Sequence, residues 1–68
     1  MKTCVILISH GSKVSSGNDG LFKVVDMLRA MNRWDMVEAA FLQLAEPPFS
    51  EVVKKIVERG ASRIVVMP

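Results

Sequence analysis

The chain has 68 residues and a formal net charge of +2, and 50% of its residues are hydrophobic. This length allows one domain, and so apolar a composition excludes a disordered chain. The basic residues are scattered, so the charge pattern offers no basis for nucleic-acid binding. No apolar run approaches the ~20 residues of a membrane-spanning helix, so we expect no membrane segment. Cys4 is the single cysteine, which predicts a reduced core thiol in a cytoplasmic protein.

The first predicted element is a strand over Thr3–Ser9, a run of apolar and β-branched residues without polar alternation. Such a run is typical of a strand buried on both faces, as in a parallel sheet. The stretch 11–20 is rich in Gly, Ser, Asn and Asp and predicts a loop that ends in a helix cap. A helix then follows from apolar residues at helical spacing, which we expect to pack in the core: Leu21, Val24, Val25, Leu28 and Met31.

A second strand is predicted to begin at about Met36. It ends before the prolines at 47 and 48, because proline is excluded from a sheet interior but tolerated in a helix's first turn. Gly60 stands where a left-handed C-terminal cap belongs. Another continuous apolar strand follows within 62–68. The helix between the prolines and Gly60 is indicated by an apolar stripe: Phe49, Val52, Val53, Ile56 and Val57.

This succession of elements predicts an α/β fold with one domain, residues 1–68. We expect a three-stranded parallel sheet in the order 2-1-3, with two right-handed crossover helices. In such sheets ligands bind beyond the carboxyl ends of the strands, where the strand order reverses. We place His10, Gln43 and Pro68 at the three carboxyl ends, so the expected site is the crevice that they share.

His10 is the only histidine and directly follows the first strand. A neutral imidazole binds borderline divalent metals and can accept a proton near neutral pH. The residues after it, Gly11 and Ser12, permit a tight turn whose N–H groups can bind carboxylate or phosphate oxygens. The alternative is a histidine ring that only satisfies a loop carbonyl.

Three motifs together resemble a known family: "ILISHGSK", "AFLQLAEP" and "GASRIVVMP". They are similar to the amino-terminal half of the small class II chelatases, the sirohydrochlorin cobaltochelatase group, over essentially the full chain. The resemblance implies a lyase that inserts a divalent metal into a tetrapyrrole. That metal is cobalt, or in some relatives nickel or iron, and the product leads to cobalamin, coenzyme F430 or sirohaem.

Carried over to this chain, the resemblance makes His10 the metal ligand and the acceptor of pyrrole protons. It also makes the neighbouring residues 9 and 11–13, which are Ser9, Gly11, Ser12 and Lys13, candidates to bind the substrate carboxylates. Gln43 stands where the family usually has glutamate, and it offers an amide oxygen but no negative charge. Glu46 is a candidate substitute for that charge, or else a solvated residue ahead of the helix.

The family's second histidine has no counterpart among these 68 residues, so we expect a domain that is incomplete as a single chain. An apolar third strand at the rim of the sheet then predicts a homodimer or larger homo-oligomer, which would pool two His10 rings. Two other readings stay open. One is a truncated chelatase-like module without catalysis. The other is phosphoryl transfer to His10, although that class needs an arginine where this chain has Ser9.

Overall fold

The computed structural model describes residues 1–11 and 17–68. Within them, the structure confirms the predicted succession of elements and gives their bounds: β1 Thr3–Ser9, α1 Asp19–Ala30, β2 Met36–Phe41, α2 Phe49–Glu58 and β3 Arg63–Met67. The first strand has its predicted ends. The second strand stops at Phe41, earlier than the prolines suggested, and 42–48 form a loop.

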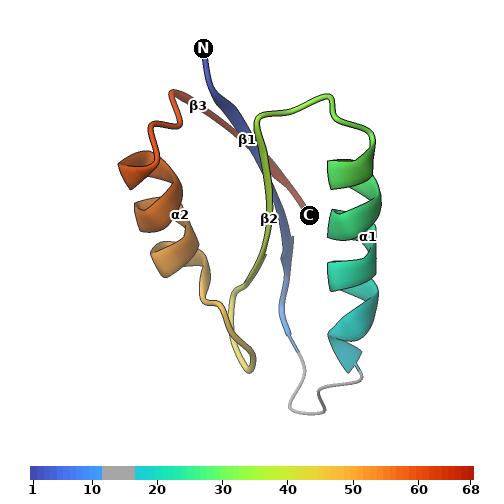
Figure 1. Ribbon diagram of the computed structural model, residues 1–68. Helices are drawn as coiled ribbons and strands as arrows, with labels where there is room; N and C mark the ends of the chain where they lie inside the picture. Colours follow the sequence, from blue (N-terminus) through green and yellow to red (C-terminus); the bar gives the residue numbers. More distant parts are fainter. Residues whose placement is uncertain (12–16) are drawn as a thin grey trace.

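The three strands form one parallel sheet in the order β2-β1-β3, as predicted. Figure 1 shows α1 and α2 on opposite faces of this sheet, and the carboxyl ends of β1 and β2 lie at the same end of it. In register, Ser9 of β1 pairs with Phe41 of β2, whereas the last residue of β3, Met67, pairs with Leu7. The central position of β1 explains its uninterrupted apolar sequence, because β1 has a strand on each side and a helix on each face.

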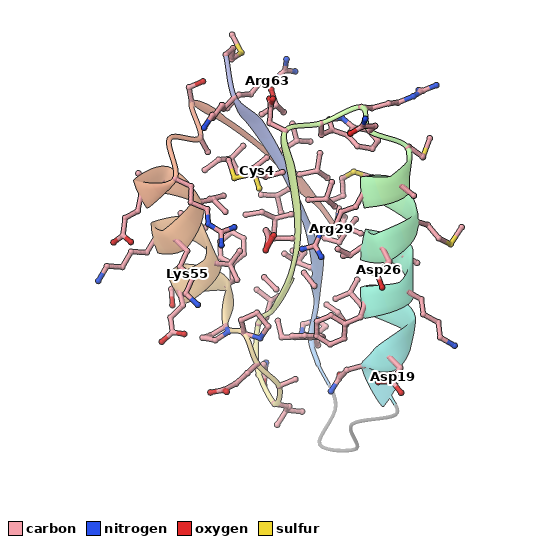
Figure 2. The ribbon with its side chains drawn as sticks, viewed as in Figure 1. Cys4, Asp19, Asp26, Arg29, Lys55 and Arg63 are labelled. Atoms are coloured by element: carbon pink, nitrogen blue, oxygen red, sulfur yellow. The ribbon has the colours of Figure 1, made fainter. Side chains whose placement is uncertain are left out.

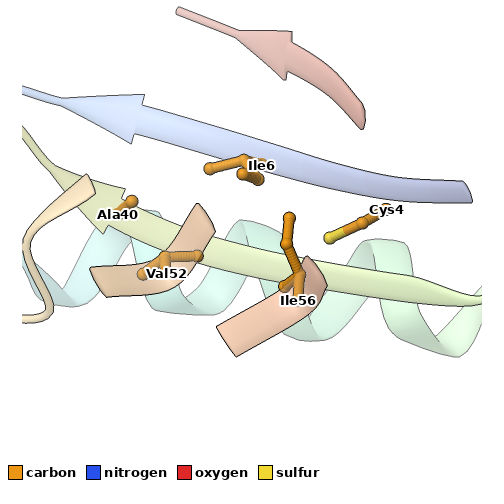
Figure 3. Close-up of a cluster of buried hydrophobic side chains, with 5 residues drawn as sticks. All are labelled: Cys4, Ile6, Ala40, Val52 and Ile56. Carbon is orange, nitrogen blue, oxygen red and sulfur yellow. The ribbon is translucent and has the colours of Figure 1, made fainter. Parts of the chain in front are cut away.

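The face under α2 holds a compact apolar cluster (Figure 3). Cys4 and Ile6 of β1 point to this face, and Val52 and Ile56, one helical turn apart on α2, close over them. Ala40 of β2 completes the buried set, and its small side chain lets the helix approach the sheet. Complete burial of Ile6 alone is worth about 2 kcal/mol of transfer free energy.

The opposite face of the sheet packs against α1. The alternate residues of β1 and β2 point to this face and form a buried cluster with one residue of the helix: Val5, Leu7, Val37, Ala39 and Val25. Leu21 and Leu28 contact this cluster as predicted, but the predicted core role of Val24 and Met31 is wrong. Both side chains are exposed, because only one flank of α1 faces the sheet and these two residues lie on the neighbouring flank.

The end of α2 confirms the predicted glycine cap. Gly60 has φ +94°, its N–H donates to the Val57 carbonyl at 3.0 Å, and the Ala61 N–H donates to the Ile56 carbonyl at 2.9 Å. This pair of bonds is a Schellman motif, which needs a residue that adopts positive φ at low cost. Among the described residues, no helix has the length and apolar character to cross a bilayer.

Candidate functional site

The candidate site lies at the carboxyl ends of β1 and β2, where the ladder continues past the strands. The Leu42 N–H donates to the Ser9 carbonyl at 2.8 Å, and the Gln43 N–H donates to the His10 carbonyl at 3.0 Å. These two bonds hold the backbone of His10 beside that of Gln43, as the sequence predicted. The side chains of both residues are exposed, so they are available to a ligand.

Gly11 is required by the geometry of this turn. Its φ is +90°, and a Cβ at this position would clash with the backbone carbonyl oxygen of Gln43 and lie 3.1 Å from the Ala45 Cβ. Its N–H points to the Ser9 Oγ at 3.4 Å, a long hydrogen bond within the turn. The glycine after His10 therefore has a structural role first: it lets the loop after β1 pack against the loop after β2.

The loop between β2 and α2 is fixed at both ends. The Phe41 N–H donates to the Pro47 carbonyl at 2.9 Å, and Gln43 is bound to His10 as described. Between them Leu44 has φ +63°, a conformation that costs a residue with a Cβ about 1–2 kcal/mol. Glu46 lies exposed on the same loop.

The metal-binding capacity of the site rests on very few groups. In the part of the chain that the structure describes, no cluster of three or more His, Cys, Asp or Glu side chains can hold a metal ion. His10 and the amide oxygen of Gln43 are the two potential donors whose backbones meet here. Two predicted carboxylate-binding residues, Ser12 and Lys13, lie outside the described residues.

In register, Pro68 lies further back than His10 and Gln43. Met67 of β3 is level with Leu7, two residues before the end of β1 and about 7 Å back along the strand. Pro68, the next residue, is therefore set back from His10, and the predicted meeting of Pro68 with His10 and Gln43 in one crevice is corrected to His10 and Gln43 alone.

Cys4 is no candidate ligand. It is fully buried under α2, and burial, with a smaller contribution from the charge of Glu38, raises the pKa of its thiol from 9.0 to about 11. Metals and electrophiles react with the thiolate, which is scarcely populated at neutral pH with so high a pKa. The predicted burial of Cys4 in the core is confirmed.

A feature that sequence reasoning missed is Arg29, in the last turn of α1. Its Nε donates to the Val37 carbonyl at 2.9 Å, and its Nη2 pairs with Glu38 Oε2 at 2.9 Å (Figure 2). A hollow of about 340 Å³ beside it is also lined by Trp34 and Arg59. This hollow follows the first half of β2, away from His10, and the protein's own acceptors already occupy the Arg29 guanidinium. No local sequence signal distinguishes such an arginine from a solvated one.

The CbiX family model matches residues 4–68 of the chain. The sirohydrochlorin cobaltochelatase of Methanopyrus kandleri is 36% identical over 64 residues, covering 94% of this chain and 45% of the relative. That of Methanocaldococcus jannaschii is 33% identical, with the same coverage of both chains. The chloroplastic sirohydrochlorin ferrochelatase of Arabidopsis thaliana is 34% identical over 94% of this chain and 28% of its own length. The chain thus spans about half the length, or less, of these curated relatives.

Proposed function

Because the chain belongs to the CbiX family, we propose that it takes part in inserting a divalent metal ion into a tetrapyrrole of the sirohydrochlorin type. Cobalt is the metal of the archaeal relatives' names and iron that of the plant relative's name, so both are candidate substrates, with nickel as a third. The proposed setting is the cytoplasm, where a free thiol such as Cys4 stays reduced.

The observation that carries the proposal is the pairing of two loops around the only histidine. The Gln43 N–H holds the His10 carbonyl at 3.0 Å, and Gly11 is shaped to allow this contact. An exposed imidazole is thus placed at the carboxyl end of the central strand, at the position where open parallel sheets bind ligands.

Metal insertion needs a ligand that releases the ion and a base that accepts the pyrrole protons. The exposed imidazole of His10 suits both tasks, because the same ring nitrogen can bind the incoming ion or a proton. Gln43 can add a neutral oxygen ligand, which holds a cation more weakly than a carboxylate does. Ser9, Gly11, Ser12 and Lys13 are proposed to bind the carboxylates of the macrocycle.

A titration with cobalt and nickel tests this assignment in the absence of tetrapyrrole. We expect weak binding that His10→Ala reduces about tenfold or more, equivalent to about 1.4 kcal/mol, because one imidazole supplies most of the affinity. Gln43→Glu should bind more tightly, since it adds a negative charge beside the imidazole. Lys54→Ala, on the exposed surface of α2, serves as the control and should leave binding unchanged. Equal affinity of His10→Ala and the unmodified chain would refute the assignment.

A second candidate is a metal-binding module without insertion activity. It is favoured by the small number of metal donors among the described residues. The absorption spectrum of sirohydrochlorin incubated with cobalt and the chain separates the two candidates. A His10-dependent spectral change faster than the uncatalysed reaction supports insertion, whereas histidine-dependent metal binding without it supports the module.

We also propose, from the apolar composition of β3, that the chain forms a homo-oligomer.

A further inference from the structure

The loop between β2 and α2 contains a residue whose backbone conformation does not suit its side chain. The described residues with positive φ are Gly11, Asn32, Leu44 and Gly60. Glycine adopts positive φ without steric cost, and asparagine tolerates it better than most other residues. Leu44, with φ +63°, is the exception, because its Cβ crowds the backbone in the left-handed region. A glycine would make the same turn with less strain, so the turn alone does not explain a leucine.

Packing in the core does not explain the choice of leucine either. The side chain of Leu44 is 55% exposed, and it belongs to neither apolar cluster of the sheet. The side chain of Leu42, two residues earlier, is 50% exposed. Single exposed leucines are common on protein surfaces, but these two flank Gln43, whose N–H donates to the His10 carbonyl. Apolar surface is thus presented on both sides of a residue of the candidate site.

The strand pattern places part of this apolar surface on the same side of the sheet as the imidazole. Ile8 of β1 and Ala40 of β2 both face α2. Because side chains alternate along a strand, His10 and Leu42, each two residues further on, belong to the α2 side as well. The Leu42 N–H donates to the Ser9 carbonyl at 2.8 Å, so the pairing of the two chain segments extends to this point.

We propose that Leu42 and Leu44 form an apolar platform for the flat face of a ring-shaped ligand whose polar atoms reach His10. This inference rests on the proposed function, in which that ligand is a tetrapyrrole. The groups already placed at the site are polar and can bind the metal or the carboxylates of such a ligand. They leave the apolar face of its ring without a partner, and burial of that face against leucine removes apolar surface from water.

The platform also explains why the loop keeps a strained leucine. Glycine at position 44 would relieve the strain but offer no side chain to the ring. Asparagine would place an amide under an apolar face, where its polar atoms lose their hydration. Strained conformations are found preferentially at sites that bind ligands, where the side chain is held in place before the ligand arrives. Leu44 is therefore a specificity-determining residue that favours a flat apolar ring over a small polar anion.

Leu44→Gly tests the platform, because glycine accepts the same backbone conformation and removes only the apolar side chain. We expect its unfolding temperature to equal that of the unmodified chain or to exceed it by up to about 5 °C, since the strain is relieved. The variant should bind metal-free sirohydrochlorin about tenfold more weakly, measured through the fluorescence of the ligand. Lower stability with unchanged affinity would mean that Leu44 packs against protein, which overturns the platform.

Two further variants make the comparison specific. Leu44→Asn tolerates positive φ and keeps a side chain, but a polar one, so it should lose affinity as Leu44→Gly does. Val57→Ser is the matched control, because Val57 is 54% exposed on α2, near the end of the helix remote from the loop. It should leave the affinity for sirohydrochlorin unchanged. An equal loss of affinity in Val57→Ser would show that the effect is not local and would overturn the assignment.

Ionic strength separates the apolar contact from contacts with the ligand's carboxylates. Salt at about 0.5 M screens exposed charges, so both the unmodified chain and Leu44→Gly should bind more weakly. The ratio of their two dissociation constants should stay near tenfold, because an apolar contact is not screened. A ratio that falls to one at high salt overturns the apolar contact.

The remaining outcomes distinguish this inference from the proposed function. Sirohydrochlorin that binds with an affinity independent of Leu44 overturns the platform alone, and absence of any binding to the unmodified chain overturns both proposals. Sedimentation equilibrium is measured at the same protein concentrations. Self-association that Leu44→Gly abolishes would mean that a second copy covers the leucines, which also overturns the platform. The titration with cobalt and nickel needs no tetrapyrrole, so it tests His10 separately.

Discussion

β1 and β3 are alike in sequence and opposite in environment. Both are continuous apolar runs, and they lie side by side in one sheet. Four successive residues of β1 are buried, whereas β3 contains no fully buried residue. The difference arises because both helices and β2 gather around β1, and β3 receives only the margin of each layer. An apolar run thus predicts a strand, and the neighbours decide whether that strand lies in the core.

Truncating an isoleucine to alanine on each of the two strands should give the largest difference in the free energy of unfolding. We expect Ile6→Ala to lower the free energy of unfolding by about 2–5 kcal/mol, because it opens a cavity in a fully buried cluster. Ile64→Ala removes a side chain that is 37% exposed and should cost about 1 kcal/mol. Urea denaturation of the two variants measures both costs. Equal costs would contradict the contrast between the strands.

The glycines that flank these strands offer a second matched pair. Gly11 follows β1, Gly60 precedes β3, and both have positive φ. An added Cβ at Gly60 meets only the Lys2 side chain, at 3.8 Å, so Gly60→Ala should cost about 1 kcal/mol for the backbone conformation alone. Gly11→Ala should cost about 2 kcal/mol more, because the Cβ also clashes with the Gln43 carbonyl. Thermal unfolding of both variants would expose an error in this account if their midpoints fell equally.

The pH dependence of stability should reveal the burial of the Cys4 thiol on β1. Its pKa in the folded state is raised from 9.0 to about 11, so the unfolded chain loses this proton first as pH rises. The stability that this raised pKa preserves is fully present below pH 9.0 and is lost as pH rises toward about 11. Over this range the free energy of unfolding falls by at most about 1.4 kcal/mol per pH unit. Denaturation midpoints between these pH values should fall more steeply for the unmodified chain than for Cys4→Ala.

A cysteine on β3 sharpens the same comparison. Ile64 is the register partner of Cys4, and Ile64→Cys in the Cys4→Ala background moves the thiol to the edge strand. We expect this exposed thiol to add little to the pH dependence of the denaturation midpoint. A dependence as steep as that of the unmodified chain would mean that burial of the thiol is not its cause.

The smallest effect concerns Arg29, which contacts β2 from the last turn of α1. Arg29→Met keeps most of the aliphatic side chain but removes the bonds to Val37 and Glu38, and it should cost about 1 kcal/mol because the arginine is half exposed. Arg63→Met on β3, where no described residue offers an ion pair, should change stability by less than about 0.5 kcal/mol. Urea titration of both variants gives the comparison. A larger cost for Arg63→Met would contradict the stabilising role given to the bonds of Arg29.

The sequence by itself determined the elements, their order and the place of His10. These follow from local causes: runs of β-branched residues, apolar spacing along helices, prolines before α2 and the glycine cap at Gly60. The strand order 2-1-3 was predictable because short right-handed crossovers leave few alternatives. The resemblance to the chelatases was readable because its motifs contain His10, Gly11 and Gln43, which the structure brings together at the candidate site.

Only the tertiary structure decided which residues of these elements have neighbours. Val24 and Val25 are adjacent in sequence, yet one is exposed and the other buried, because the sheet reaches one flank of α1 alone. The contact of Gly11 with Gln43 and that of Arg29 with Val37 join segments whose spacing carries no periodic signal. The set-back position of Pro68 relative to His10 is likewise a matter of register. Burial and register depend on contacts between distant segments, and local propensity contains no information on those contacts.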